Sequence, residues 1–556
     1  MSGRDGGLVD GGARTVRPVG ERAFLVECRD LDEVLALHAA LLRDPVPGQV
    51  DVLAAARTVL VRLADRRTRD RAAAVLASFP APPPARTAGR LVVIDTLYDG
   101  PDLAAVGELT GLAVEEVVAR HTAGEWVAAF GGFAPGFAYL VSDGPGLSVP
   151  RRESPRTAVP AGSVALAGEF SAVYPRRSPG GWQLIGRTGA AMWDLDREPP
   201  ALVRPGDRVR FRAVRELVTA GRSRGDVPST RGPDGGGVTP SSRGAALAVV
   251  ATGPLSLVED LGRPGLADLG VSPSGALDRG AAVQANRLVG NDREAAVIET
   301  VLGGLELQAH GSHVLAVSGA PAPLTVLVDG AETWRPPLDA PFPLGDGEVV
   351  RLGSPATGFR SYVAVRGGVA VRPVLGSRST DVLSGTGPPP LAAGDVLPVG
   401  EAPRTAVGRP EPARTPAEGV VEVGVVPGPR RDRLSADART RFLAEEWTVT
   451  ERSNRVGLRL DGEPLTRAET AELPSEGTVA GAVQVPADGR PVVFLADHPV
   501  TGGYPVVAVV READRDVLAQ VRPGERVRFV MAPEDGVRDA LEDGGGRVVP
   551  AGGAGR

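Results

Sequence analysis

The stretch RPGDRVRF at 204–211 recurs as RPGERVRF at 522–529, and this repeat is the strongest indication of the fold. Two further elements precede each copy in the same order, VPAGSVAL (159–166) with TVAGAVQV (478–485), and Gly180-Gly181-Trp182 with Gly502-Gly503-Tyr504. A Pro-Gly-acid turn before a strand is common by itself. Because three elements recur in one order, we interpret them as a duplicated β-rich domain.

The sequence around both copies has a pattern that predicts short strands. After Glu125, apolar runs of a few residues alternate with Gly and Pro, which is typical of a β-barrel or sandwich. A second β-rich region extends from Leu247 to about Ala532, interrupted by a Pro/Glu/Arg stretch near 401–417. Weaker echoes at 344–352 and 392–400 indicate two further lobes.

Residues 15–80 follow a different pattern, in which strand and helix alternate. TVRPVGERAFLVEC predicts a strand, and the apolar residues of LDEVLALHAALL recur at helical spacing from Leu31. VDVLAAARTVLVRL and RDRAAAVLASF repeat that order, and a Pro-rich connector from Pro80 follows. From Leu91 a strand leads to two short helices. We therefore expect a mainly β protein with a small N-terminal α/β domain.

Composition excludes several classes of function. The net charge of −6 gives no basic field for nucleic acid or an anionic membrane, so neither is expected as a partner. The start lacks the apolar core of a secretory signal, and no apolar run approaches the ~18 residues of a membrane span. Cys28 is the sole cysteine, which rules out an intrachain disulfide and a cysteine metal site. We expect a cytoplasmic protein.

The chain contains no lysine. It therefore cannot carry covalent biotin, form a Schiff base or use the lysine of a phosphate-binding loop. If the protein binds phosphate, backbone N–H groups and arginines must supply the contacts.

Glycine-rich polar loops mark the first half as a candidate binding region. GGFAPGFAYL at 131–140 places glycines among aromatics that would wall a small pocket, although a tight turn at a barrel end explains it equally well. The loop 178–188 suits an anion-binding concavity. The residues that we assign to substrate or nucleotide binding here are Phe133, Gly136, Tyr139, Arg156, Gly162, Ser178, Gly180 and Gly181.

In the second half, carboxylates and arginines gather in polar loops, chiefly 258–278 and 374–385. In 258–278 they suit proton transfer or Mg²⁺ coordination, but Ser274 or Asp278 would also serve as the N-cap of a following helix. The loop 374–385 suits phosphate or carboxylate binding, or is a solvated turn. His498 is the one histidine in a polar motif, and a lone histidine is more often structural. We expect Glu299 at a strand end on the surface rather than inside.

The candidates of the second half fall into two groups. The candidate catalytic residues are Asp260, Arg263, Asp278, Arg378 and His498. The candidate binding residues are Ser274, Asn286, Ser377, Ser379, Ser453, Asn454, Arg455, Thr501, Gly502, Gly503 and Tyr504. No Ser-His-Asp arrangement, zinc motif or dinucleotide fingerprint emerges, and no residue is assigned to a metal.

With these motifs the chain resembles two families joined end to end. GGFAPGFAYL, PRTAVPAGSVAL and SPGGWQLIGRT, within 14–215, are similar to the B subunit of 5-oxoprolinase, the KipI-type or allophanate hydrolase subunit 1 family. EDLGRPG, SGALD, ANRLVGN, VLGSRST, SNRVGLRL and TGGYP, within 247–532, are similar to the C subunit of the same enzyme, the KipA-type or allophanate hydrolase subunit 2 family. Arg430-Arg431-Asp432 departs from the C-subunit pattern, which usually has Gln there, and so does the run before TGGYP.

The resemblance implies several cyclophilin-like β-barrels, tandem in the C-terminal half. The domains expected are an α/β domain (14–85), a B-type barrel (90–215), a flexible linker (216–246), two C-type lobes (247–400 and 418–532) and a Gly-rich tail (533–556). We expect the active cleft where the B-type and C-type modules face each other.

The resemblance also implies a function, the ATP- and Mg²⁺-dependent opening of the small molecule 5-oxoproline to glutamate, together with a separate 5-oxoprolinase protein of the A type. Two alternatives stay open. The first is a urea-type carboxyltransferase that uses a separate biotin carrier, and the second is a KipI-like inhibitor of a sensor kinase. A homo-oligomer is compatible with all three.

Overall fold

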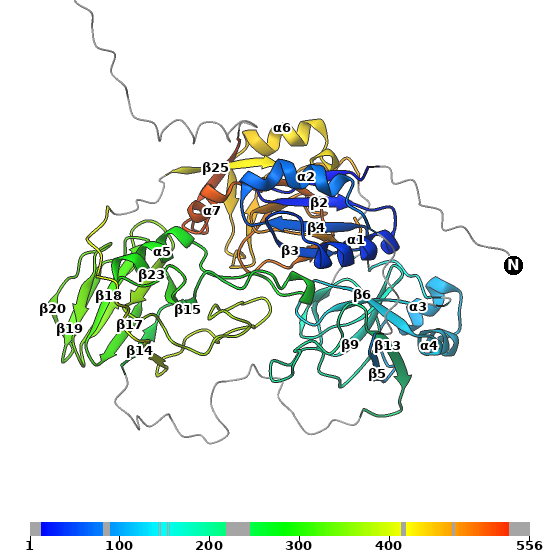
Figure 1. The fold of residues 1–556 in the computed structure, drawn as a ribbon, viewed down its shortest axis with the longest axis horizontal. Helices are drawn as coiled ribbons and strands as arrows, with labels where there is room; N and C mark the ends of the chain where they lie inside the picture. The colour runs from blue at the N-terminus through cyan, green and yellow to red at the C-terminus, as the bar shows by residue number, and fades with distance from the viewer. Residues whose placement is uncertain are drawn as a thin grey trace, which may run out of the picture.

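The computed structural model describes residues 13–81, 89–142, 144, 146–152, 154, 156–217, 245–412, 419–469 and 473–532 (Figure 1). The predicted tail at 533–556 and all but the ends of the predicted linker at 216–246 lie outside these residues. Among the described residues, no helix has the length and apolar character needed to cross a membrane. Below, residues 13–217 are called the B-type module and residues 245–532 the C-type module.

The N-terminal domain is a four-stranded antiparallel sheet in the order β1-β2-β4-β3 with two main helices. Its elements are β1 (Val16–Pro18), β2 (Ala23–Glu27), α1 (Leu31–Arg43), β3 (Gln49–Ala54), β4 (Thr58–Leu63), η1 (Arg66–Thr68) and α2 (Arg69–Ala77). Asp30 caps α1 by accepting a hydrogen bond from the Glu33 amide at 2.9 Å. Neighbouring residues of β2 pack into two different cores, Phe24 with the helices and Leu25 with the C-type module. The sheet is therefore buried on both faces.

The rest of the B-type module is built on a strongly curved seven-stranded sheet in the order β12-β9-β10-β7-β6-β13-β5. Its elements are β5 (Leu91–Thr96), α3 (Leu103–Thr110), α4 (Val114–Ala123), β6 (Trp126–Gly131), β7 (Ala138–Ser142), β8 (Arg156–Val159), β9 (Ser163–Ala167), β10 (Phe170–Val173), β11 (Ser178–Gly180), β12 (Gln183–Arg187) and β13 (Arg208–Ala213). β8 and β11 form a separate two-stranded ribbon.

The first lobe of the C-type module consists of two packed sheets, of six and five strands. Its elements are β14 (Ala246–Thr252), β15 (Leu255–Glu259), η2 (Ala267–Leu269), α5 (Arg279–Leu288), β16 (Val297–Val301), β17 (Leu305–His310), β18 (His313–Gly319), β19 (Leu324–Val328), β20 (Ala331–Trp334), β21 (Phe342–Leu344), β22 (Val349–Leu352), β23 (Arg360–Val365) and β24 (Val396–Pro398). The segment after β15 leaves this lobe and reaches β3 and β6 of the B-type module (Figure 1).

The second lobe is a closed barrel in the order β25-β32-β29-β30-β27-β26-β33. Its elements are β25 (Val420–Pro427), η3 (Arg431–Arg433), α6 (Ala436–Ala444), β26 (Trp447–Val449), β27 (Gly457–Asp461), β28 (Glu476–Gly477), β29 (Ala482–Gln484), β30 (Val492–Phe494), β31 (Thr501–Gly502), β32 (Val506–Val510), α7 (Glu512–Leu518) and β33 (Arg526–Met531).

The repeat seen in the sequence occupies equivalent places in the two modules. β13 and β33 are each the last strand of their sheet in chain order, and each pairs in parallel with the first, β5 or β25. Each also pairs antiparallel with a strand that begins at a buried tryptophan, so that Val209 lies opposite Trp126 and Val527 opposite Trp447. Both indoles donate to a carbonyl five residues earlier, at 3.0 and 3.2 Å. The mainly β architecture with barrel-like sheets confirms the predicted fold class.

The N-terminal domain packs on the barrel of the second C-type lobe, far from it in sequence (Figure 1). Leu25, Leu53 and Leu60 share one apolar core with residues of the barrel strands. A buried arginine, Arg430, stands between the carboxylates of Glu27 and Glu476 and pairs with both. Arg430 belongs to the Arg-Arg-Asp run that differs from the C-subunit pattern, so a residue that is unusual for that family links the two modules here.

Candidate active site at the junction of the two modules

The GGFAPGFAYL loop of the B-type module connects β6 to β7 and is clamped between two segments of the C-type module. Phe133 and Gly136 both have positive φ angles, of 60° and 80°, which turn the loop sharply. The Phe133 amide donates to Thr501 Oγ1 at 2.8 Å, and the Gly136 amide donates to the Leu269 carbonyl at 3.3 Å. A Cβ atom at Gly131 would clash with the Asp268 carbonyl. The predicted binding loop therefore lies at the junction of the modules, tightly packed.

Behind this loop the aromatics form a buried cluster. Phe130 and Tyr139 stack with ring centroids 4.4 Å apart, and Phe137 meets Tyr174 and Trp182 edge-to-face at 5.3 and 5.4 Å. The Tyr139 hydroxyl shares a hydrogen bond of 3.3 Å with Ser475 Oγ of the C-type module. The aromatics thus pack one side of the junction, as expected for a tight turn at a barrel end, and the Tyr139 hydroxyl reaches across it.

Arginines line the adjoining part of the B-type module. Arg152 Nη1 and Arg156 Nη2 donate to Asp102 Oδ1 at 2.8 and 2.7 Å, while Arg152 Nε and Arg156 Nη1 are buried without a partner in the described part of the chain. Burial favours the neutral acid, but the hydrogen bonds from Arg156 and the Leu184 amide outweigh it and hold the pKa of Asp102 below its ordinary value. Two cations therefore share one buried anion, with donors left over.

The remaining candidates of the B-type module lie in the turns beside these arginines. The Gly162 amide donates to the Tyr174 carbonyl at 2.8 Å, and Ser178 Oγ donates to the Arg176 carbonyl at 3.4 Å. Gly180 lies opposite Arg156 in the β8–β11 ribbon, and the Gly181 carbonyl accepts from the Arg152 amide at 2.8 Å. These turns set the backbone of the arginine-bearing segment.

The TGGYP turn of the C-type module faces the GGFAPGFAYL loop. Thr501 and Gly502 pair with Gly477 and Glu476 in a short ribbon, and the Tyr504 carbonyl accepts from Gln484 Nε2 at 3.2 Å. A Cβ atom at Gly503 would lie 3.2 Å from Arg151 Nη1 of the B-type module. Thr501, Gly502 and Gly503 are therefore brought to the junction, as their motif led us to expect.

His498 lies just before this turn and is buried. Its ring stacks on Phe494 with centroids 5.7 Å apart, and Nδ1 lies 2.9 Å from its neighbour, the Pro499 carbonyl. Burial lowers the pKa of His498 to about 4. A neutral, packed imidazole is suited to a structural role at pH 7, and the catalytic assignment stays a prediction.

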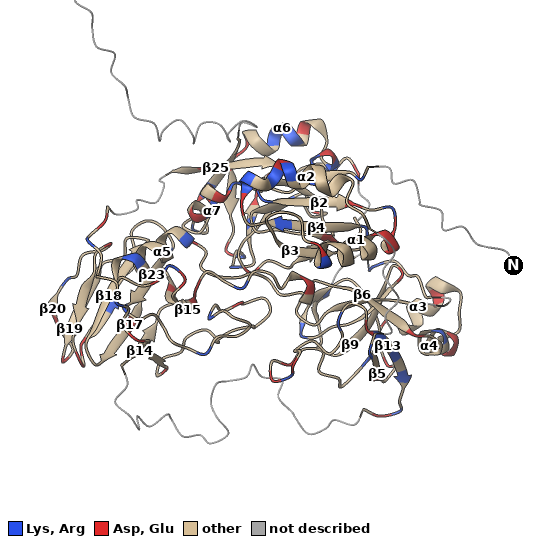
Figure 2. Cartoon of the chain, viewed as in Figure 1, with Lys and Arg blue, Asp and Glu red and all other residues tan. Residues whose placement is uncertain are grey.

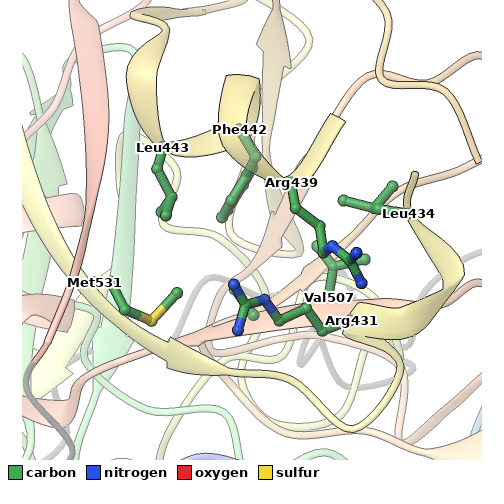
Figure 3. A pocket seen from close by; sticks show the side chains of 8 residues that line it. Arg431, Leu434, Arg439, Phe442, Leu443, Val507 and Met531 are labelled. Atoms are coloured by element: carbon green, nitrogen blue, oxygen red, sulfur yellow. The ribbon is translucent and has the colours of Figure 1, made fainter. Parts of the chain in front are cut away.

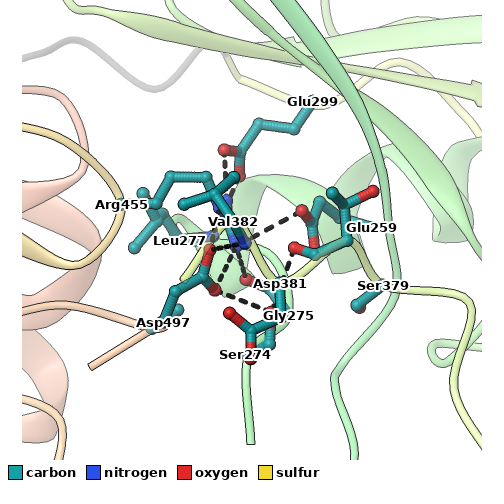
Figure 4. Close-up of polar contacts among 12 residues, drawn as sticks. Glu259, Ser274, Gly275, Leu277, Glu299, Ser379, Asp381, Val382, Arg455 and Asp497 are labelled. Carbon is teal, nitrogen blue, oxygen red and sulfur yellow. Dashed lines mark hydrogen bonds and ion pairs between the residues drawn. The ribbon is translucent and has the colours of Figure 1, made fainter. Parts of the chain in front are cut away.

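A second polar cluster, fully buried, joins the two lobes of the C-type module around Arg455 (Figure 4). Arg455 Nε donates to Asp497 Oδ2 at 3.0 Å, and Nη2 donates to the Gly275 carbonyl at 2.7 Å. The same guanidinium pairs with Glu299 and lies 3.3 Å from Glu259 Oε1. Arg455, predicted to bind a ligand, is thus saturated by contacts within the protein.

The pKa values of Glu259 and Glu299 are shifted in opposite directions although the two carboxyls share this cluster. Burial, reinforced by the charges of Glu299 and Asp497, raises the pKa of Glu259 well above its ordinary value. Burial also opposes ionisation of Glu299, but Arg455 and Arg360 outweigh it and lower the pKa of that carboxyl. Our expectation of a surface position for Glu299 is wrong, since its exposure is 2%. The inward orientation lets it accept the Tyr362 hydroxyl at 2.8 Å.

The 374–385 loop is organised by Asp260. Asp260 Oδ1 accepts from Ser377 Oγ and Ser379 Oγ, both at 2.6 Å, and Oδ2 accepts from the Arg378 amide at 2.6 Å. The Arg378 side chain is half-buried and donates from Nε to the Val371 carbonyl at 2.9 Å. The hydroxyls predicted to bind phosphate are therefore turned toward a carboxylate, whereas the outer part of Arg378 stays accessible. Arg263 contacts the same loop through the Ser379 carbonyl.

The remaining candidates hold the backbone in place. Asp278 Oδ1 accepts from the Ala281 amide at 2.8 Å and so caps α5, which is the structural role that the sequence had left open for it. Ser274 Oγ donates to Asp497 Oδ1 at 2.7 Å. Asn286 Nδ2 donates to the Ala295 carbonyl at 2.7 Å. Ser453 and Asn454 make local turn contacts, accepting from the amides of Arg459 and Val456. Their functional assignment stays a prediction.

Sequence reasoning missed Asp102 and Asp381, and it noted Glu259 and Asp497 only as members of polar motifs, without counting them among the candidate site residues. The sequence does carry a signal for Glu259, which ends the apolar strand LSLVE. In a strand every second side chain points to the same face, so an acid in register with apolar residues points inward with them. Asp102 and Asp381 carry no such signal, since each lies in a polar turn.

The described residues offer no group of three or more His, Cys, Asp or Glu side chains placed to hold a metal ion. Most of the buried donors that stand unpartnered in the described part of the chain are guanidinium N–H groups, with a few hydroxyls such as that of Thr386, and these suit oxyanions rather than cations. A small pocket bounded by α6, β32 and β33, with Arg431, Leu434 and Met531 among its lining residues, lies in the second lobe (Figure 3). It has room for little more than one water molecule, so it is no nucleotide site.

Two family models match the chain. The model described as "Carboxyltransferase domain, subdomain C and D" matches residues 14–203, and "Carboxyltransferase domain, subdomain A and B" matches residues 269–531. The chain is 37% identical to the 5-oxoprolinase C subunit of Escherichia coli (strain K12) over 53% of its own length and 94% of that protein. It is 48% identical to the 5-oxoprolinase B subunit of Escherichia coli O157:H7 over 23% of its length and 61% of that protein.

Solved structures share the arrangement as well as the sequence. The crystal structure of TTHA0988 is similar with a TM-score of 0.77 and 37% identity, over 92% of this chain and 99% of that one. The Kluyveromyces lactis urea carboxylase is similar with a TM-score of 0.50 and 29% identity, over 54% of this chain and 28% of that one.

Proposed function

The chain belongs to the carboxyltransferase-domain family and joins in one polypeptide the counterparts of the B and C subunits of 5-oxoprolinase, and on that basis we propose that it is the B–C component of an ATP-dependent 5-oxoprolinase. It activates the lactam carbonyl of 5-oxoproline, and a separate A-type protein completes hydrolysis to glutamate. The observation that supports this most is the contact between the two modules, each of which resembles a different subunit of that enzyme.

The chemistry explains why ATP is needed. A five-membered lactam is a poor electrophile, because its nitrogen donates electron density to the carbonyl carbon. In the proposed reaction the carbonyl oxygen attacks the γ-phosphorus of ATP, the bond from phosphorus to the bridging oxygen breaks, and ADP leaves. Water then adds to the activated carbon, and the C–N bond breaks to leave an acyl phosphate and a free amine. A second water attacks the same carbon, phosphate departs with the former carbonyl oxygen, and glutamate is formed. Phosphoryl transfer of this kind depends on positioning and charge neutralisation.

We place this chemistry at the junction of the modules. Arg152 and Arg156 carry buried N–H groups without partners among the described residues there, and Arg151 Nη2 donates to Ser475 Oγ of the other module at 3.3 Å. These guanidinium groups would neutralise phosphate without lysine. Mg²⁺, when bound with the nucleotide, would add charge neutralisation at the phosphates. The GGFAPGFAYL and TGGYP loops fix the distance between the modules.

The decisive experiment follows one oxygen atom. 5-Oxoproline labelled with ¹⁸O in its lactam carbonyl is incubated with ATP, Mg²⁺, this protein and an A-type partner protein, and the inorganic phosphate is analysed by mass spectrometry. Carbonyl phosphorylation transfers the label to phosphate, together with partner-dependent release of ADP and glutamate. Unlabelled phosphate would refute activation at that oxygen even if glutamate were formed.

Arg378 gives a matched pair for the same assay. Arg378→Ala removes a half-buried guanidinium from the 374–385 loop and is expected to abolish turnover while keeping the fold, whereas Arg372→Ala removes an exposed one nearby and should change little. Equal turnover for both variants removes Arg378 from the site.

A second function is favoured by the urea carboxylase likeness and by the family description. In that case the chain transfers carboxylate from carboxybiotin to urea, with biotin supplied by a separate carrier, because this chain has no lysine to hold it. If neither ADP nor glutamate appears with a partner proven active, consumption of carboxybiotin in the presence of urea is the next measurement.

A further inference from the structure

Two arginines from different modules converge on one loop of the C-type module, residues 381–387. Arg176 follows β10 in the B-type module, and Arg263 lies in the segment after β15. A Cβ atom at Gly385 would lie 3.2 Å from Arg176 Nη1, and one at Gly387 would lie 3.2 Å from Arg263 Nη2. Because Gly385 and Gly387 are two positions apart, the two guanidinium groups approach the same short stretch of backbone.

Around this loop several hydrogen-bond donors are buried but unused. In the described part of the chain, Arg176 Nη1, Arg263 Nε, Arg263 Nη1 and Thr386 Oγ1 have no hydrogen-bond partner. Arg263 is 2% exposed and Thr386 is 1% exposed, so bulk water does not satisfy them. Buried donors are paired in the great majority of cases, because an unpaired one loses its hydrogen bond to water without a replacement. Four such atoms around one loop indicate a ligand.

The neighbouring carboxylates do not accept hydrogen bonds from these free guanidinium N–H groups. Asp381 accepts from the amides of Leu383 and Ser384 at 2.9 and 3.0 Å and from the Ser384 hydroxyl, all within its own loop. Asp260 is engaged by serines and an amide, as described above. Among the described residues, neither Arg176 nor Arg263 has an ion pair. The charge of Asp381 acts on both arginines and that of Asp260 on Arg263, but neither carboxylate accepts from the free N–H groups, which are left without an acceptor in the described part of the chain.

We propose that Arg176, Arg263 and Thr386, arranged on the 381–387 loop, form an oxyanion subsite whose ligand is a phosphoryl group. Two guanidinium groups and a hydroxyl offer more free hydrogens than one carboxylate accepts, whereas a phosphoryl group presents several acceptor oxygens in different directions. The subsite needs both modules, since Arg176 belongs to one and the loop to the other. That its phosphoryl group comes from ATP rests on the proposed function, but the subsite itself does not.

The test uses inorganic phosphate and the whole chain, without a partner protein. Isothermal titration calorimetry compares the wild type with Arg176→Gln and Thr386→Val, and Arg177→Gln is the matched control because Arg177 is the exposed neighbour of Arg176. We expect saturable binding by the wild type and the control. Loss of the charged contact in Arg176→Gln should weaken binding roughly ten- to hundredfold. Thr386→Val should weaken it less, since a neutral hydroxyl is lost.

Either of two results overturns the proposal. The first is that the wild type does not bind phosphate saturably, and the second is that Arg176→Gln and Arg177→Gln bind phosphate with equal affinity. A parallel titration with the 5-oxoproline anion separates the two sources of an oxyanion. If Arg176→Gln weakens that binding alone, the phosphoryl assignment is wrong. If the labelled-oxygen assay fails but phosphate still binds, the proposed function is wrong and the subsite stands. If the assay succeeds but phosphate does not bind, only the subsite is wrong.

Discussion

Replacing Arg455 by Met should destabilise the C-type module strongly, because it removes the cation of a buried cluster while nearly keeping the volume. Arg455 is 2% exposed, pairs with Asp497 and Glu299, and lies near Glu259. Without it, carboxylates from both lobes remain buried with too little positive charge. Breaking a buried pair in this way costs about 3–5 kcal/mol. For a domain of this size, each kcal/mol lowers the unfolding midpoint by about 2–4 °C, so we expect a loss of roughly 6–20 °C.

Differential scanning calorimetry measures that midpoint, and Arg452→Met is the matched control, since Arg452 is exposed three residues earlier. The control should stay within about 0.5 kcal/mol of the wild type. The double variant Arg455→Met/Asp497→Asn should recover part of the loss, because one uncompensated charge disappears. The reasoning fails if Arg455→Met matches the control, or if the double variant is less stable than Arg455→Met alone.

Three further predictions concern other parts of the molecule. Burial raises the pKa of the Cys28 thiol to about 12, so a thiol reagent should label it at pH 8 in denaturant but not in the native protein, and equal labelling would contradict this. Burial lowers the pKa of His498 to about 4 in the folded protein, whereas its pKa in the unfolded chain is about 6.5. As the pH drops from about 6.5 to about 4, the unfolded chain therefore binds the proton first, and the stability of the folded protein falls. His498→Gln should flatten that fall in urea midpoints taken at pH 7 and 4.5, and an unchanged slope would exclude this histidine. Thr501→Val removes the acceptor of the Phe133 amide, so that amide should exchange its hydrogen faster with solvent while Thr501→Ser preserves its protection, and equal protection in both variants would show that the contact does not form.

The candidate site divides into what local patterns predict and what they do not. The motifs GGFAPGFAYL and TGGYP predict functional loops, and the structure brings them together through Phe133 and Thr501. Ser377 and Ser379 are predicted to bind a ligand, yet both donate to Asp260, more than a hundred positions away. A polar composition indicates that a loop has donors, but the acceptor they meet depends on which segment folds against them.

By itself the sequence determined the alternation of strand and helix in the N-terminal domain, the duplicated barrel and the exclusion of lysine chemistry. These rest on local periodicity, on repeated turns and on composition, all of which are read within a few residues. The sequence did not show that each predicted strand of that domain is a pair of strands, β1 with β2 and β3 with β4. Tertiary structure alone decided that β2 is buried on both faces, that Glu299 points inward, and that Arg176 and Arg263 meet at one loop. The physical reason is that charge pairing and desolvation depend on distances in space, and the partners here come from lobes that are hundreds of residues apart.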